Sequence, residues 1–292
     1  MEVKNLLTVK KIVETGSYQN AAKSLDYSQS TITFQIKQLE KELGYQIFNR
    51  QGHSMVLSSN GKKIMPMINQ ILSTVDEIEN IDKKNNISGE VILAVPESLI
   101  TYQLQPLLRE FKKIAPNARL IIKVMNCFAI QDQVNQGNID LGIHYDVGND
   151  ESVYQKKLHN FSLALVCSPL LLSQKDKDFT TRNQIKDICH IQNDTNALYL
   201  KYFHQYLKNK NIVLSNTLEL WSIESIKQSV HSNLGIAFLP RFTVEKEIEN
   251  GFLQEIPLKD FSYELQAVAS YKRNHFQNNA TKLLINLLNK YF

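Results

Sequence analysis

Residues 21 to 40 read Ala21-Ala22-Lys23-Ser24-Leu25-Asp26-Tyr27-Ser28-Gln29-Ser30-Thr31-Ile32-Thr33-Phe34-Gln35-Ile36-Lys37-Gln38-Leu39-Glu40. Two short helical patterns meet in this segment across a tight turn. Ser28 is suited to cap the second helix, because its hydroxyl can accept a hydrogen bond from an amide one turn later. Ile32, Ile36 and Leu39 then fall on one face of that helix. The segment therefore predicts a helix-turn-helix.

The opposite face of the second helix is available to a partner. It carries mostly short polar side chains and one cation, namely Gln29, Ser30, Thr31, Thr33, Phe34 and Lys37. Such side chains can reach base edges in a DNA groove, and the cation can reach a phosphate. An ordinary surface helix is the alternative, since exposed helix faces are usually polar.

The flanking residues favour the DNA-binding interpretation. An apolar helical stripe begins with Val3, Leu6, Leu7 and Val9. Gly44 is expected to end the second helix of the motif with a positive φ. Residues 45 to 57 then predict two short strands around a polar turn, with Arg50 in this wing. The outline is that of a winged helix-turn-helix.

Residues 1 to about 63 resemble the N-terminal domain of the LysR-type transcriptional regulators. The matching strings are Gly16-Ser17, Ala21-Ala22-Lys23-Ser24-Leu25, Ser28-Gln29-Ser30, Ile36-Lys37-Gln38-Leu39-Glu40, Leu43-Gly44, Ile47-Phe48, Arg50 and Leu57-Ser58-Ser59-Asn60-Gly61. Two later strings, Asn138–Ile143 and Gly235–Pro240, also stand where the family would have them. The chain departs from the family at Ser30, where proline is usual, and at Phe34, where Arg or His is common.

The resemblance implies a sequence-specific transcription regulator that binds double-stranded promoter DNA and senses a small metabolite effector. It also implies a homodimer that assembles into a homotetramer, with RNA polymerase as a further partner. The residues expected at the DNA are Ser28, Gln29, Ser30, Thr31, Thr33, Phe34, Lys37 and Arg50.

The charge distribution agrees with this interpretation. Residues 1 to 63 carry nine Lys or Arg and five Asp or Glu, an excess of four that equals the net charge of the whole chain, +4. The excess positive charge thus lies on the suspected DNA-binding domain, as expected of a surface that meets phosphates.

Length and composition indicate a multidomain protein of the cytoplasm. The 292 residues are 43% hydrophobic, which is enough for two domains that each bury a core. Neither an 18-residue apolar run nor an N-terminal segment suited to export is present, so no membrane partner is expected. Cys127, Cys167 and Cys189 are an odd set with no CxxC spacing, which argues against a disulfide framework and a zinc ribbon. Neither a metal site nor a cofactor is expected.

A long helix is predicted from Ser58 to about Asn86. Its apolar residues alternate four and three apart, at Ile64, Ile68, Ile71, Val75 and Ile78. This spacing predicts a dimerisation seam with the same helix of a second subunit, the alternative being packing on the chain's own C-terminal domain. Pro66 is expected to bend the helix, and Ser88-Gly89 reads as a hinge.

From Glu90 onward strands and helices alternate, which predicts parallel α/β structure. The fold class expected is α/β multidomain, and by resemblance the C-terminal part has two Rossmann-like lobes similar to periplasmic binding proteins. The expected domains are a DNA-binding domain at 1–58, a linker helix at 59–87 and an effector-binding domain at 88–292. Lobe I would comprise about 88–166 and 267–292, lobe II about 167–266, with the crossovers near Cys167 and Ala267.

Ligands of such lobes bind at the carboxyl ends of strands, beside helix N-termini. The effector-binding residues expected on this basis are Glu97, Ser98, Leu99, Asn126, Phe128, Thr195, Ser222 and Ile223. For Ser98, Thr195 and Ser222, plain helix capping is the alternative. A carboxylate such as Glu97 would repel an acidic ligand, so an amino acid or a cationic effector stays open.

Catalysis is not expected. The chain has no nucleophile elbow, no Gly-x-Gly-x-x-Gly string and no His-Glu-x-x-His pair. The alternative function is a solute-binding protein without a DNA role, which would be expected to carry an export signal.

Overall fold

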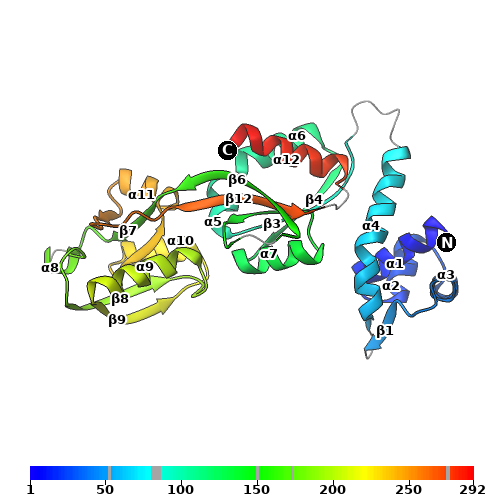
Figure 1. Cartoon of the computed structure of the whole chain (residues 1–292), viewed down its shortest axis with the longest axis horizontal. Coiled ribbons are helices and arrows are strands. Elements are labelled where there is room, and N and C mark those ends of the chain that lie inside the picture. The colour runs from blue at the N-terminus through cyan, green and yellow to red at the C-terminus, as the bar shows by residue number, and fades with distance from the viewer. Residues whose placement is uncertain (52–53, 80–86, 149–150, 172–173, 274–276) are drawn as a thin grey trace. The chain divides into compact units, whose positions relative to one another are not determined.

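The computed structural model describes residues 1–51, 54–79, 87–148, 151–171, 174–273 and 277–292 (Figure 1). The chain divides into two compact units, residues 1–89 with 274–282, and residues 90–273 with 283–292. In the described ranges, none of the helices is both long enough and apolar enough to span a membrane.

The first unit is the expected winged helix-turn-helix followed by a long helix. Its elements are α1 (Val3–Thr15), α2 (Tyr18–Leu25), α3 (Gln29–Leu43), β1 (Phe48–Gln51), β2 (Ser54–Leu57) and α4 (Ser59–Glu79). The Ser28 hydroxyl accepts from the Thr31 amide at 3.1 Å, and Gly44 ends α3 with a φ of 79°. Both predicted helix boundaries are therefore confirmed.

The core of this unit contains only half of the stripe predicted for α1. Leu6, Val9 and Ile12 are buried, whereas Val3 and Leu7 are 44% and 40% exposed. The buried face also includes Asn5 and Thr8, because each lies one helical turn, four residues, before a buried apolar residue, Val9 and Ile12 respectively. Polar residues in a buried stripe made the stripe hard to place from the sequence.

The predicted seam of α4 is divided between two environments. Ile68 is buried in the core of the first unit, so it offers no free surface to a second subunit, and Ile64 is half-buried against the same core. Ile71 is 36% exposed and Ile78 is 63% exposed. The helix runs through Pro66 as one element, and the part of the predicted helix at 80–86 lies outside the described residues.

Lobe I of the second unit is built on a five-stranded sheet in the order β4-β3-β5-β12-β6. The strands are β3 (Gly89–Val95), β4 (Ala118–Val124), β5 (Leu141–Tyr145), β6 (Val153–Phe161) and β12 (Leu265–Lys272). β3 and β5 are parallel as expected, but β12 runs antiparallel to both of its neighbours. Figure 1 shows α7 (Cys127–Gln136) on one side of the sheet and α6 (Gln105–Ile114) with α12 (Asn279–Tyr291) on the other.

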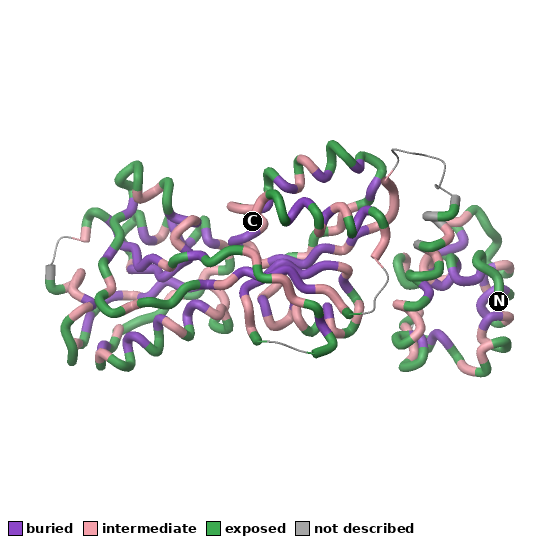
Figure 2. Tube along the Cα trace, turned by 45° about the horizontal axis from the view of Figure 1, so that its top comes forward, coloured by how far each residue is buried: buried purple, intermediate pink, exposed green. Residues whose placement is uncertain are grey.

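Lobe II contains a three-stranded antiparallel sheet and a parallel pair. The first has the order β10-β7-β11, with β7 (Leu163–Cys167), β10 (Ala237–Pro240) and β11 (Gln254–Ile256); the second pairs β8 (Gln184–Gln192) with β9 (Ile212–Glu219). The helices are α8 (Gln174–Lys177), α9 (Leu198–Lys210), α10 (Ile223–His231), the 3-10 helix η1 (Arg241–Thr243) and α11 (Glu245–Glu249). In both lobes the buried residues concentrate on the central strands, which are β3, β5 and β12 in lobe I and β7 and β10 in lobe II (Figure 2).

The crossovers between the lobes differ slightly from those predicted. Phe161 pairs with Leu265 in lobe I, while Leu163 already pairs with Pro240 in lobe II. The first crossover is therefore at Ser162 rather than near Cys167, and the return precedes Leu265 rather than lying near Ala267. In the sequence only Ser162 interrupts the apolar residues from Phe161 to Cys167, so strand pairing is needed to identify the first crossover.

Candidate functional site

The exposed face of α3 forms the first candidate site. Gln29, Ser30, Thr33, Phe34 and Lys37 line one shallow hollow on the surface of the first unit. Phe34 is 68% exposed, which is unusual for so large an apolar side chain. The structure thus brings these five predicted side chains of α3 together on one accessible surface, whereas Thr31 does not line the hollow.

Hydrogen bonds show which of these residues use their polar atoms within the helix itself. The Ser28 hydroxyl lies 2.7 Å from the Ser30 hydroxyl and 2.8 Å from that of Thr31. Thr33 donates to the Gln29 carbonyl at 2.9 Å. The hydroxyl groups therefore organise the start of α3.

The longer side chains of Gln29, Phe34 and Lys37 are better placed to reach a partner beyond the helix surface. Arg50 lies exposed on β1, opposite Met55 in the hairpin. The predicted turn of the wing, residues 52 and 53, falls outside the described residues.

A cavity of about 200 Å³ between lobes I and II forms the second candidate site. Of the predicted effector-binding residues, Glu97, Ser98, Asn126 and Ile223 line it. The Asn126 side chain also caps α7, since it accepts from the Ala129 amide at 2.9 Å. The cavity therefore lies where the strand-end rule places it, with walls from both lobes.

Four predicted residues are not in the cavity wall. Leu99 is fully buried in the core of lobe I. Thr195 is exposed in a turn, and its neighbours Asp194 and Asn196 line the cavity in its place. Phe128 lies under the Lys201 ammonium, which is 4.6 Å from the ring centroid. Ser222 lies next to the wall and directs its hydroxyl to Glu97 at 3.4 Å.

Several wall residues were not among those chosen from the sequence, namely Tyr145, Asp194, Tyr199 and Trp221. Tyr145 is the last residue of β5, so the rule that ligands bind at strand ends could have found it. Asp194 lies in the same turn as Thr195, and only the turn geometry distinguishes the two. Trp221 directly precedes Ser222, which was selected in its place.

The cavity floor carries neutral hydrogen-bonding groups. The hydroxyls of Ser98 and Tyr145 lie 2.7 Å apart, so Ser98 acts here and not as a helix cap. The Tyr199 hydroxyl donates to Asn193 Oδ1 at 2.7 Å. Burial raises the pKa of Tyr145 and of Tyr199, and it raises the pKa of the Cys127 thiol to about 12. Cys127 is therefore protonated at neutral pH and is a poor nucleophile.

Glu97 links the two lobes across the cavity. Its Oε1 accepts from the Ile223 amide at 3.1 Å, and its Oε2 lies 3.3 Å from the same nitrogen. Ile223 is the first residue of α10, and the N-terminus of a helix attracts negative charge. The carboxylate of Glu97 therefore occupies the position that an anionic ligand would otherwise take.

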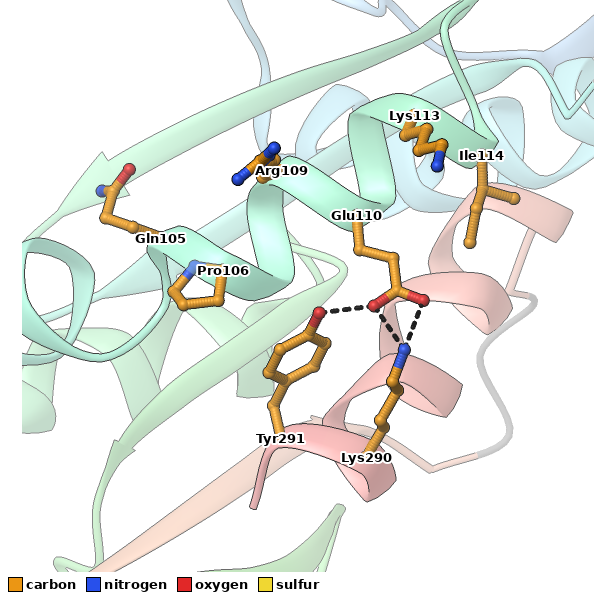
Figure 3. A pocket seen from close by; sticks show the side chains of 8 residues that line it. All are labelled: Gln105, Pro106, Arg109, Glu110, Lys113, Ile114, Lys290 and Tyr291. Atoms are coloured by element: carbon orange, nitrogen blue, oxygen red, sulfur yellow. Dashed lines mark hydrogen bonds and ion pairs between the residues drawn. The ribbon is translucent and has the colours of Figure 1, made fainter.

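A second hollow lies on lobe I between α6 and α12 (Figure 3). The Glu110 carboxylate accepts from the Lys290 ammonium at 2.8 Å and from the Tyr291 hydroxyl. Lys290 is 63% exposed, so this groove is open to water and its facing charges are already paired. The cavity between the lobes is the better ligand site because several of its polar groups, namely those of Ser98, Tyr145 and Tyr199, are buried. Across the described ranges, no cluster of three or more His, Cys, Asp or Glu could hold a metal ion.

Two family models match the chain. Residues 3–62 match the model of the bacterial regulatory helix-turn-helix protein of the lysR family, and residues 84–292 match the LysR substrate binding domain. The chain is 36% identical over 272 residues to the uncharacterized HTH-type transcriptional regulator YfiE of Escherichia coli (strain K12), which covers 93% of this chain and 92% of that protein. It is 31% identical over 265 residues to the uncharacterized HTH-type transcriptional regulator YwqM of Bacillus subtilis (strain 168), which covers 88% of each.

Solved structures share the fold at low sequence identity. ArgP from Mycobacterium tuberculosis has a TM-score of 0.76 at 12% identity and covers 98% of this chain and 96% of that chain. Full-length LysG from Corynebacterium glutamicum, solved with bound effector Arg, has a TM-score of 0.71 at 13% identity and covers 100% and 98%. These two likenesses concern the fold alone.

Proposed function

Since the chain belongs to the LysR family of transcriptional regulators, we propose that α3 reads DNA sequence and that the cavity between the lobes binds the effector. Membership makes the protein a transcriptional regulator with a DNA-binding and an effector-binding domain. The observation that carries the proposal is the exposed face of α3, where Gln29, Phe34 and Lys37 project from a helix whose other face is buried.

The proposed partner of this face is double-stranded promoter DNA. Gln29 can form a bidentate contact with adenine, and Phe34 can pack against a thymine methyl group. Lys37 and Arg50 would contact phosphates, which fits the location of the chain's excess positive charge. Because this target is chromosomal, we place the protein in the cytoplasm. RNA polymerase is proposed as a further partner at the promoter.

The proposed assembly is a homodimer through α1 and α4. Apolar side chains remain exposed on both helices, at Val3, Leu7, Met67, Ile71 and Ile78. Exposed apolar residues in such number favour an interface, and a symmetric pair buries both copies. This surface replaces the seam that included Ile64 and Ile68. A tetramer would form through the effector-binding domains.

The proposed mechanism is a shift between two populations of the assembly. A ligand in the cavity would contact both lobes and compete with or reinforce the Glu97 link to Ile223. The altered packing of the lobes against neighbouring subunits would change the spacing and bend of the bound DNA. LysG, which has the same fold, was solved with bound effector Arg, and this supports a small molecule as the signal.

The experiment that tests DNA reading starts with selection of a binding site from a random DNA pool by the full chain. Gln29→Ala should then lose about 1 to 3 kcal/mol at the selected site, with little change on random DNA. Gln38→Ala is the matched control, because nine residues place it roughly half a turn around α3 from Gln29. Equal losses on selected and random DNA would remove Gln29 from base reading.

A further inference from the structure

We propose that the cavity between the lobes binds a small organic amine, whose ammonium group is held by the carboxylates of Glu97 and Asp194. This inference rests on the proposed function of the cavity as the effector site, and it adds the chemical class of the ligand. It follows from the charges, the occupied helix terminus and the walls of the cavity.

The first argument is the sign of the charge in the cavity. Glu97 contributes a carboxylate from lobe I and Asp194 contributes one from lobe II, while none of the described wall residues is Lys, Arg or His. Burial is the main cause that raises the pKa of the Tyr199 hydroxyl on the floor, and the charges of Glu97 and Asp194 raise it further. A partly buried cavity with two negative charges favours a cation and repels a carboxylate.

The second argument is that the N-terminus of α10, where an anion would usually bind, is already occupied by the Glu97 carboxylate. The N-terminus of α10 offers its amide to the Glu97 carboxylate, with Ile223 N at 3.1 Å and the Ser222 hydroxyl at 3.4 Å. An acidic ligand would have to displace this carboxylate and leave it without its donors. An amine needs no such displacement, because a carboxylate has about four acceptor positions and can receive an ammonium while it caps the helix.

Asp194 is in a similar position on the other lobe. Its Oδ1 accepts from the Asn196 amide at 2.9 Å, which fixes the carboxylate at the turn before α9. The two carboxylates are thus held by backbone donors of lobe II and do not depend on a ligand for their orientation. An ammonium between them would add contacts from both lobes at once.

The walls accommodate the carbon skeleton of a small molecule. Tyr145, Tyr199 and Trp221 present aromatic rings, and Met125 and Leu198 add apolar surface. Aromatic faces also attract cations. The volume of about 200 Å³ is below the 300 to 1,000 Å³ roughly typical of drug-sized ligands, so a short amine fits and a large one does not.

Trp221 allows a direct test. It is the single tryptophan of the chain, it lines the cavity, and it is 88% exposed. The full chain is titrated at neutral pH with n-propylamine and n-pentylamine, with the matched alcohols, and with n-butyrate and n-hexanoate, while tryptophan fluorescence is recorded. The amines should give saturable changes at concentrations about 10- to 100-fold lower than the alcohols. The carboxylates should give none.

Asp194→Asn should weaken amine binding by about 10- to 100-fold, since it removes one charged acceptor and keeps the shape of the side chain. Thr195→Val is the matched control, because Thr195 is adjacent, exposed and outside the cavity wall. It should leave amine binding unchanged. Thermal unfolding of both variants identifies any loss of fold.

The outcomes separate the ligand class from the proposed function. Tighter binding of a carboxylate than of its matched amine, no saturable change with either amine, or full amine affinity in Asp194→Asn would each overturn the amine assignment. A ligand that binds at Trp221 but leaves DNA affinity at the selected site unchanged would instead contradict the regulatory role of the cavity.

Discussion

The Thr8 hydroxyl donates a 2.6 Å hydrogen bond to Oε1 of Gln35, and both side chains are buried in the core of the DNA-binding domain. Thr8 belongs to α1 and Gln35 to α3. A buried polar pair is satisfied only in one relative arrangement of its two helices. The bond therefore fixes the rotation of α3 about its axis, and with it the residues that face outward.

Thr8→Val should destabilise this domain by about 1 to 3 kcal/mol, because it leaves Gln35 Oε1 buried without its donor. Chemical denaturation of the full chain, followed at the transition of the N-terminal unit, measures the loss. Thr74→Val, an exposed threonine of α4, is the control and should have little effect. If the Thr8 and Thr74 variants are equally stable, the buried bond does not stabilise the domain.

Ile71→Glu should dissociate the proposed dimer. The residue is exposed on α4, and in a symmetric helix pair the substitution would bring two like charges together. Sedimentation should show a lower mass than for the wild type. Asn69→Glu adds the same charge at an exposed position two residues away and should leave the mass unchanged. A wild-type mass for Ile71→Glu would place the interface elsewhere.

His190 should make lobe II sensitive to acid. Burial, with the nearby His204, lowers the pKa of His190 to about 4 from 6.5. The folded state therefore favours the neutral ring, and this contribution is present above pH 6.5 and is lost as the pH falls toward about 4. The shift corresponds to about 3 kcal/mol of unfolding free energy.

His190→Leu should flatten the dependence of stability on pH in that window, as measured by denaturation at several pH values. His159→Leu, at an exposed histidine, is the control. Some acid sensitivity should persist in the His190 variant, because burial also lowers the pKa of His144. An unchanged pH profile would show that His190 does not contribute.

The sequence predicted features that depend only on residues close together in the chain, such as the cap at Ser28 and the positive φ at Gly44. It also predicted that Glu97 and Ile223 line one cavity. The rule that ligands bind at the carboxyl ends of strands identifies the loops involved, and it does not require knowledge of the side-chain positions. It selected Thr195 in place of Asp194, since the direction of a side chain in a turn depends on the backbone angles. Ile68 was likewise assigned to a partner because the spacing of a seam does not distinguish a second subunit from the chain's own core.

The position of β12 in its sheet has a consequence for synthesis on the ribosome. β12 lies between β5 and β6, yet it comes last in sequence among the strands that the structure describes. The DNA-binding elements are complete once Glu79 has been synthesised. In lobe I, by contrast, β6 cannot join the sheet of β4, β3 and β5 until β12, which ends at Lys272, has been made. A chain cut short before Leu265 therefore retains a complete DNA-binding domain and exposes two unpaired strand edges, which are sites of aggregation.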